Sequence, residues 1–377
     1  MRYLVIIVIL LQIACRASQE AQPPSALDAR LVELSTLYRE RYGIPALGIA
    51  VIRSHGQPAM ALTGSGRVNS NTPLDQDAPF HLGSNTKAMT AFIAARLVEA
   101  GRIDWNSTIA EVNPAWRPLI RADYQQITLA DLLSHRAGLQ PFIEPTEFTQ
   151  LPTLPGSDSD QRRAFSLLVM QKPSRNRNIS RLLSGDHEYS NSSYVVAAAL
   201  LETADGRNYD QLLARNMREL LHLEYGVGFP ADQNPNWPSG HVGSGDAIRS
   251  VPSIVLPRYF TPAGNVQMNL ANFAAWIQIH LRGLRGQDRH LNQSTYEFMH
   301  YGRPDYAMGW KHAEHQGMRI SYHDGSAGTF FTRAIVMPDS DLALVFLTNI
   351  SNDAVRTAVS ALEAELIEAY AQNITPQ

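Results

Sequence analysis

The spacing of hydrophobic residues predicts sheet and helix at both ends of the chain. Apolar residues recur at helical spacing over residues 27–42, and Gly43 and Pro45 end that pattern. Two strand-like runs, 46–52 and 58–63, follow as a hairpin. Near the other end, three strand-like runs precede a long final helix. They span 318–323, 329–337 and 342–349, and the helix spans 353–371.

The middle of the chain has a different pattern, with helical segments separated by loops rich in Pro, Gly and Asn. The predicted helices span 86–100, 129–133, 192–203, 209–221 and 270–281. Because the strands lie at the two ends of the sequence, they must meet in space to share one core.

The sequence therefore predicts an α/β fold with an inserted all-α part. An antiparallel β-sheet, flanked by the N- and C-terminal helices, forms a sheet lobe from residues 26–82 and 306–377. Residues 83–305 form a mostly helical lobe, and 18–377 make one catalytic domain. A cleft between such lobes is a favoured place for a small-molecule site.

Composition narrows the class of protein. The 377 residues are 44% hydrophobic and 18% charged, with a formal net charge of −3. These values are typical of a globular protein, and the chain lacks the basic surplus of a nucleic-acid-binding protein. We therefore expect no nucleic-acid partner, and we expect a monomer.

The first residues have the layout of a secretory signal peptide. Arg2 precedes an apolar run over residues 3–14, and small and polar residues follow. Cleavage after Ala17 would discard Cys15, whereas cleavage before Cys15 would leave a lipid-anchored lipoprotein. Gln12 stands where a lipobox normally has leucine, which favours the first alternative. We expect an exported protein, periplasmic or secreted, that meets a membrane only if Cys15 is lipidated.

Cys15 is the only cysteine. The folded body therefore has no thiol for disulfides, cysteine catalysis or thiolate metal ligation. Catalysis must use oxygen and nitrogen groups.

Ser84 and Lys87 are the first candidate catalytic residues. They stand three positions apart at the start of a predicted helix, so they fall on one face. A desolvated Lys87 can stay neutral and take the proton of Ser84, and the helix N-terminus favours negative charge there. With three lysines in the chain, chance gives such a pair about one time in five at ordinary serine abundance. The alternative is an exposed serine near a helix start followed by a solvated lysine.

Tyr189 and Asn191 are the second candidate pair. Tyr189 is the only one of 14 tyrosines with asparagine two positions later. Its hydroxyl, close to a cationic lysine, can act as a base, and the Asn191 amide can orient a substrate carbonyl or Lys87. The alternative is a capping turn before a helix.

His323 is chosen among five His-x-Gly sites by its context. It alone closes a strand-like run and is followed by Gly325-Ser326 and another strand. Gly325 lets a substrate approach the backbone, and the N–H groups of Ser326 and Ser84 can serve as oxyanion donors. The alternative is a structural histidine.

These residues carry a resemblance. The chain resembles the serine β-lactamase and penicillin-binding protein superfamily, nearest its branch of class C β-lactamases, DD-carboxypeptidases and family VIII-type esterases, over most of residues 26–371. The matching segments are Phe-His-Leu-Gly-Ser-Asn-Thr-Lys at 80–87, Ile-Thr-Leu-Ala-Asp-Leu-Leu-Ser-His-Arg-Ala-Gly-Leu at 127–139, Tyr-Ser-Asn-Ser-Ser-Tyr at 189–194, Tyr-Ala-Met-Gly-Trp at 306–310 and His-Asp-Gly-Ser at 323–326.

The resemblance implies roles for these residues. Ser84 is the acylated nucleophile, Lys87 and Tyr189 share proton transfer, and Asn191 positions the acyl amide or ester. His323 and Gly325 form the third motif, and Ser84 and Ser326 supply the oxyanion hole. The resemblance implies no metal and no organic cofactor. The segment around His135 is interpreted as structural, because it supplies no missing chemistry.

One departure from the family bears on the substrate. Class C β-lactamases carry lysine where this chain has His323, and histidine there resembles DD-carboxypeptidases, D-aminopeptidases and related esterases. We therefore expect a hydrolase of a small amide, ester or short peptide. The alternatives are a class C-like β-lactamase and a catalytically idle binding protein of the same fold.

Overall fold

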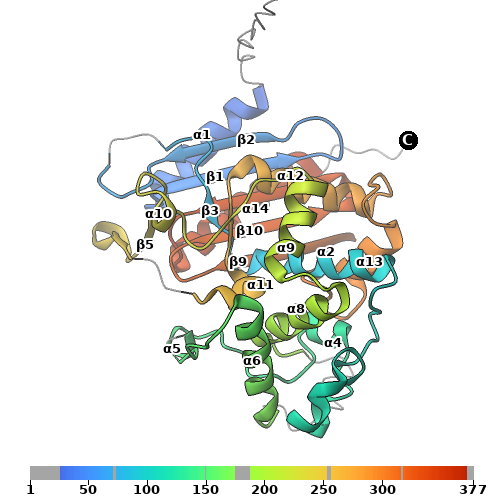
Figure 1. The fold of residues 1–377 in the computed structure, drawn as a ribbon. Helices are drawn as coiled ribbons and strands as arrows, with labels where there is room; N and C mark the ends of the chain where they lie inside the picture. The colour runs from blue at the N-terminus through green and yellow to red at the C-terminus, as the bar shows by residue number, and fades with distance from the viewer. Residues whose placement is uncertain are drawn as a thin grey trace, which may run out of the picture.

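A six-stranded antiparallel sheet forms the centre of the protein (Figure 1). The computed structural model describes residues 26–70, 74–148, 150–174, 187–252, 256–315 and 317–371, so the predicted signal peptide and Cys15 lie outside the described residues. The strand order is β2-β1-β11-β10-β9-β8. The bounds are β1 (Ala46–Ile52), β2 (Ala59–Gly64), β8 (Lys311–His315), β9 (Met318–Ser326), β10 (Phe331–Met337) and β11 (Leu342–Thr348).

The two ends of the chain meet in this sheet, as the sequence pattern predicts. β1 pairs with β11, with Leu47 opposite Thr348 and Ile52 opposite Ala343. Every residue of β1 and of β11 is buried, because both faces of the sheet are covered. The predicted antiparallel sheet with flanking terminal helices is therefore confirmed.

Helices cover both faces of the sheet. α1 (Ala26–Tyr42) and α14 (Asp353–Ala371) pack against one face, and α12 (Leu270–Leu284) packs against β1, β10 and β11 on the other. Alternate strand residues thus enter two cores: Ile49 lies in the core under α1 and α14, and Ala50 in the other. α12 falls in the range predicted for the helical lobe, but it packs on the sheet.

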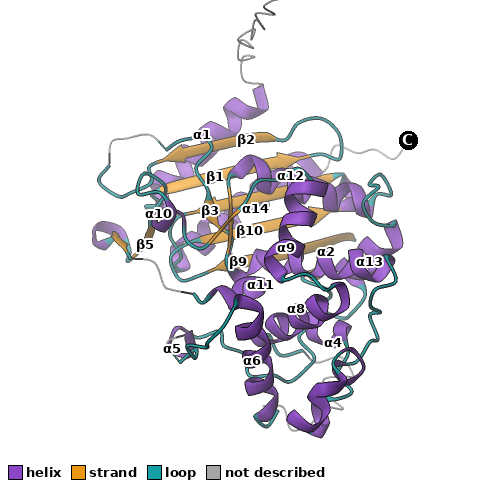
Figure 2. Cartoon of the chain, viewed as in Figure 1, coloured by secondary structure: helices purple, strands orange, loops and turns teal. Residues whose placement is uncertain are grey.

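The helical part lies beside the lower edge of the sheet in Figures 1 and 2. Its central helix, α2, has eleven buried residues among its fourteen, so it is enclosed on nearly all sides. α8, α9, α11 and α13 contact it. The helices here are α2 (Thr86–Glu99), α3 (Ile109–Val112), α4 (Leu129–Leu133), α5 (Pro145–Phe148), α6 (Asp158–Gln171), α8 (Asn191–Asp205), α9 (Tyr209–Ala214), α11 (Thr261–Gly264) and α13 (Gln293–Tyr301). The short helix α10 (Pro230–Gln233) is drawn level with the sheet (Figure 1).

Some elements differ from the prediction. The helix predicted over 209–221 ends as α9 at Ala214 and continues as a π-helical turn, Arg215–Leu220, because hydrophobic spacing does not report which hydrogen-bond pattern closes a turn. α6 and α13 were not predicted; α6 follows a Pro-, Ser- and Asp-rich stretch and is started by a capping box at Ser157.

The edge strand β8 of the main sheet and five short strands also lie outside the prediction. β3 (Phe80–His81), β7 (Val266–Met268) and β4 (Gly226–Val227) form one small sheet, and β5 (Gly240–Val242) pairs with β6 (Arg249–Val251). Runs of two or three residues are too short to show a period in sequence. β3 is important for the site, because the chain runs from its end at His81 directly into the turn that carries Ser84.

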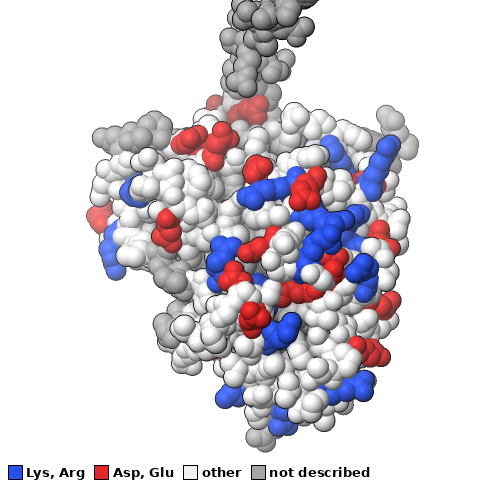
Figure 3. Space-filling view, viewed as in Figure 1, with Lys and Arg blue, Asp and Glu red and all other residues white. Residues whose placement is uncertain are grey.

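Charged side chains of both signs are interspersed on the face shown in Figure 3. Among the described residues, none of the helices has the length and apolar character needed to cross a membrane.

Candidate active site

Ser84 lies where β3 turns into α2. A short 3₁₀ turn, η1 (Gly83–Asn85), leads directly into the helix. Gly83 has a φ of 51°, and a Cβ atom placed on it would lie 2.4 Å from the backbone nitrogen of Ser326. Only glycine permits both this conformation and this approach. The serine is thereby held at the N-terminal end of a helix and against the end of β9.

Lys87 is fully buried one helical turn further on. Its Nζ lies 3.1 Å from Ser84 Oγ, 2.6 Å from Asn191 Oδ1 and 2.5 Å from the carbonyl oxygen of Ala263. Burial lowers the pKa of this amine well below its ordinary value of 10.5. Among the described ion pairs, none engages Lys87, so no carboxylate offsets the cost of burying its charge.

The number of hydrogen bonds that Lys87 can donate depends on its charge. A neutral amine has two N–H groups and one lone pair. Asn191 Oδ1 and the Ala263 carbonyl accept the two N–H bonds, which leaves the lone pair for the hydroxyl proton of Ser84. The arrangement therefore suits a neutral lysine that accepts a proton from the serine.

Asn191 is fixed with its oxygen toward Lys87. Its Nδ2 donates to the carbonyl oxygen of Phe142 at 2.6 Å, so Oδ1 must face the amine. The Ser190 side chain, which accepts from the Ser193 N–H, starts the helix α8 that carries Asn191. Of the two predicted roles for Asn191, the geometry shows orientation of Lys87, and the residue also lines the cavity beside Ser84.

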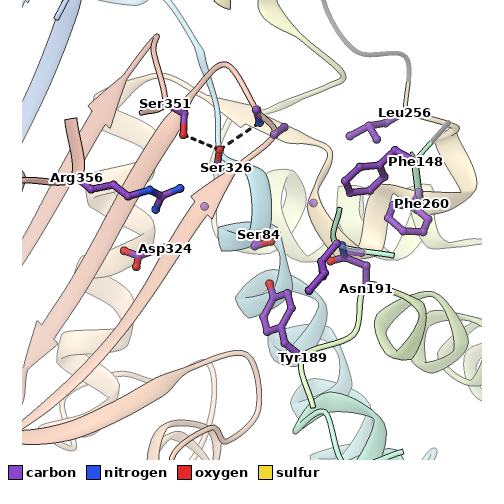
Figure 4. Close-up of a pocket in the computed structure, with 16 residues that line it drawn as sticks. Ser84, Phe148, Tyr189, Asn191, Leu256, Phe260, Asp324, Ser326, Ser351 and Arg356 are labelled. Atoms are coloured by element: carbon purple, nitrogen blue, oxygen red, sulfur yellow. Dashed lines mark hydrogen bonds between the residues drawn. The ribbon is translucent and has the colours of Figure 1, made fainter. Parts of the chain in front are cut away.

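Tyr189 lies on the other side of the serine. Its ring centroid is 4.8 Å from Lys87 Nζ, and its hydroxyl points toward Ser84 (Figure 4). Burial raises the pKa of Tyr189 above its ordinary value, although a hydrogen bond with Ser84 opposes the rise. The phenol therefore holds its proton, while the lowered pKa of Lys87 favours the neutral amine, which can accept one. This division favours lysine as the base and tyrosine as a proton donor.

His323 lies behind the cavity and is 2% exposed. Its Nδ1 donates to the carbonyl oxygen of Asp324 at 2.6 Å, so its Nε2 accepts from the hydroxyl of Tyr306 at 2.9 Å. Burial lowers the pKa of His323 to about 3, which keeps the ring neutral. Both ring nitrogens are thus engaged by the protein, and His323 is not among the residues that line the cavity.

Gly325 and Ser326 bring the end of β9 against the serine. A Cβ atom on Gly325 would lie 1.9 Å from the carbonyl oxygen of Leu82, so only glycine fits. Thr332 on β10 holds the segment around Ser84 in place. Its Oγ1 donates to the carbonyl oxygen of Leu82 at 2.9 Å and lies 2.8 Å from the side-chain amide of Asn85. The main chains of Ser84 and Ser326 are thereby fixed side by side, which is the placement an oxyanion hole requires.

A cavity of about 460 Å³ opens in front of Ser84 (Figure 4). One wall is apolar, with Phe148 and Phe260 among its residues, and the other is polar, with Ser351 and Arg356. Its lining consists of Ser84, Ile143, Phe148, Tyr189, Asn191, Leu256, Phe260, Ala263, Gly264, Asp324, Gly325, Ser326, Ala327, Gly328, Ser351 and Arg356.

Ser351 and Arg356 line the cavity but were not identified as site residues from the sequence. Ser351 Oγ accepts a hydrogen bond from Ser326 Oγ at 3.0 Å, and Arg356 stands near the start of α14. The sequence predicts that helix but gives no signal that its first turn lies beside the end of β9. The individual residues of the apolar wall could not be named from the sequence either, because the wall is assembled from segments more than 100 residues apart.

Among the described residues, no group of three or more His, Cys, Asp or Glu side chains is placed to hold a metal ion. The site is built from hydroxyl, amine, phenol and backbone N–H groups.

Comparison with known proteins agrees with this site and fold. The beta-lactamase family model matches residues 27–367, and the chain belongs to that family. The predicted resemblance is therefore confirmed.

Individual relatives are distant. The chain is 21% identical over 347 residues to protein flp of Staphylococcus aureus, covering 86% of this chain but only 63% of that protein. A class C beta-lactamase from Rhodobacter sphaeroides superposes with a TM-score of 0.67 at 19% identity, covering 91% of this chain and 100% of its own. The D-amino acid amidase from Ochrobactrum anthropi superposes with a TM-score of 0.67 at 18% sequence identity, covering 90% of this chain and 99% of its own. These structures share the fold, and both are hydrolases.

The lowered pKa of Lys87 predicts how the activity depends on pH. Because its pKa is lowered, the active neutral amine forms as pH rises through a value well below 10.5. We expect kcat/KM for a neutral ester, measured from pH 5 to pH 10, to rise and then reach a plateau. Lys87→Arg, which stays charged, should lose about 10²-fold or more at every pH.

His323→Gln serves as the control for this profile. With a pKa of about 3, His323 does not titrate between pH 5 and pH 8, so the rising limb should stay where it is in the wild type. A rate that climbs without a plateau to pH 10 would contradict a lowered pKa at Lys87.

Proposed function

We propose that this chain is an exported serine hydrolase that forms an acyl-enzyme with a small amide or ester. The observation that carries the proposal is the set of contacts around the buried Lys87 Nζ, which lies 3.1 Å from Ser84 Oγ and 2.6 and 2.5 Å from two carbonyl oxygens. In its neutral form this amine can bond both carbonyl oxygens and accept the proton of Ser84. Such an amine raises the nucleophilicity of the serine without any carboxylate or histidine.

The reaction follows from the placement of the groups. Lys87 Nζ takes the hydroxyl proton of Ser84 while Oγ attacks the carbonyl carbon, and the N–H groups of Ser84 and Ser326 stabilise the oxyanion. As the tetrahedral intermediate collapses, the bond to the leaving group breaks and Tyr189 gives that group a proton, which Lys87 replaces. A water molecule then attacks the ester on Ser84 by the same steps in reverse and releases the acid.

The two walls of the cavity suggest the substrate class. The apolar wall at Phe148 and Phe260 suits an aromatic or aliphatic group. On the opposite wall, Arg356 contacts the ring of Phe331 through its guanidinium at 4.7 Å, and no ion pair found in the described part of the chain involves it. A free cation at the rim suits a substrate with a carboxylate, such as a short D-amino-acid peptide of cell-wall type.

Two alternatives follow from the same fold. A class C-like β-lactamase is disfavoured, because His323 has no nitrogen free for the carboxylate of a β-lactam. A catalytically idle binding protein is disfavoured, because the nucleophile, the amine and the phenol lie together with suitable geometry.

Export and a monomeric state remain parts of the proposal. Export rests on the pattern of residues 1–17, with cleavage after Ala17 or lipidation at Cys15 as the two outcomes.

Replacement of the nucleophile tests the proposed function. We expect Ser84→Ala to lose about 10³-fold or more in kcat on a panel of a p-nitrophenyl ester, nitrocefin and a D-Ala-D-Ala peptide. Exposed Ser244→Ala should match the wild type. Unchanged turnover by Ser84→Ala would refute the serine mechanism, and rapid nitrocefin turnover by the wild type would favour the β-lactamase alternative.

Replacement of Arg356 tests the substrate class. We expect Arg356→Gln to raise KM for a carboxylate-bearing peptide about 5- to 10-fold, because a charge-assisted hydrogen bond is lost. The KM for a neutral ester of similar size should change less than about twofold, since that ester has no partner for the cation. Equal effects on both substrates would contradict anion recognition by Arg356.

A further inference from the structure

His135 lies in the turn that follows α4 and is completely buried. Its φ of 61° places it in the left-handed region, where most side chains are disfavoured. The segment around it was interpreted as structural in the sequence, because no chemistry was assigned to it. Two of its hydrogen bonds, however, are made with the loop that carries Tyr189.

His135 holds the backbone on both sides of Tyr189. Its carbonyl oxygen accepts from the Glu188 N–H at 2.9 Å, and its Nδ1 accepts from the Ser190 N–H at 3.1 Å. One residue thus fixes the peptide groups immediately before and after the tyrosine. The left-handed conformation allows this, because it turns the carbonyl and the side chain of His135 toward the same segment.

The ring of His135 also packs on the tyrosine. The ring centroids of His135 and Tyr189 lie 4.2 Å apart, and the ring centroid of Tyr306 lies 4.4 Å from that of His135. Burial lowers the pKa of His135 well below its ordinary value. The ring therefore stays neutral, and this is necessary because only a neutral imidazole can accept a hydrogen bond at Nδ1.

We propose that His135 is a positioning residue for Tyr189: it fixes the phenol at the point where a leaving group departs from Ser84. The proposal rests on the proposed function, in which Tyr189 donates that proton. His135 itself touches neither substrate nor Ser84. Its effect on the reaction therefore depends on whether the leaving group needs a proton.

Two replacements separate the side-chain role from the backbone conformation. Asparagine and glycine both tolerate a positive φ, but only asparagine has an acceptor, Oδ1, at the position of Nδ1. We expect His135→Asn to keep most of the activity. We expect His135→Gly to lose it selectively, because a displacement of about 1 Å can cost about 10²-fold.

The measurement compares two esters of the same acid with different leaving groups. On ethyl butyrate, whose alkoxide must be protonated, His135→Gly should lower kcat/KM about 30- to 100-fold. On p-nitrophenyl butyrate, whose phenolate departs without a proton, the loss should be less than about fivefold. Tyr189→Phe should show the same selectivity, and adding His135→Gly to Tyr189→Phe should cost less than about threefold more.

Ser134→Ala is the matched control, since Ser134 is equally buried at the same turn and its hydroxyl donates to the carbonyl oxygen of Ala130. It should behave as the wild type on both esters. Equal losses of His135→Gly on the two esters, or equal activity of the Asn and Gly variants, would overturn the positioning role. If Tyr189→Phe itself shows no leaving-group selectivity, the proposed proton donation by Tyr189 fails instead.

Discussion

The burial of one uncompensated amine governs the active site. Lys87 has no carboxylate partner among the described residues, so its charged form is costly and its neutral form is favoured. In the neutral form, the carbonyl oxygens of Asn191 and Ala263 accept its two N–H groups, and its lone pair can accept the proton of Ser84. A nucleophile is thereby activated by desolvation and geometry alone.

The fold serves this amine by bringing three distant parts of the chain within contact. The turn η1 carries Ser84 and the helix α2 that follows it carries Lys87, α8 carries Asn191, and α11 supplies the Ala263 carbonyl. The end of β9 in the sheet closes the remaining side of the site. Because Gly83 and Gly325 have no side chains, the backbone before Ser84 packs directly against the backbone of β9. His135 and Arg136 extend the support: His135 holds the loop around Tyr189, and Arg136 donates to the carbonyl oxygen of Tyr306, whose hydroxyl engages His323.

Much of this could be predicted from the sequence, because the information is local. The continuous apolar runs of β1 and β11, the Ser84–Lys87 spacing and the single Tyr-x-Asn pair are all readable within a few residues. Properties that depend on tertiary packing were not readable. The sequence could not show that both nitrogens of His323 are taken, that Arg356 reaches the cavity, or that β3 pairs with β7. Each depends on segments that are far apart in the chain.

Activation of Ser84 by a neutral Lys87 should make this serine reactive toward electrophiles that label nucleophilic hydroxyl groups. The most direct measurement is the intact mass of the protein after incubation with a fluorophosphonate, followed by peptide mapping of the adduct. If a neutral Lys87 activates Ser84, the wild type should carry one phosphonyl group on Ser84 and Lys87→Arg should carry none. An unlabelled wild type, or labelling of Lys87→Arg at the same rate, would contradict it.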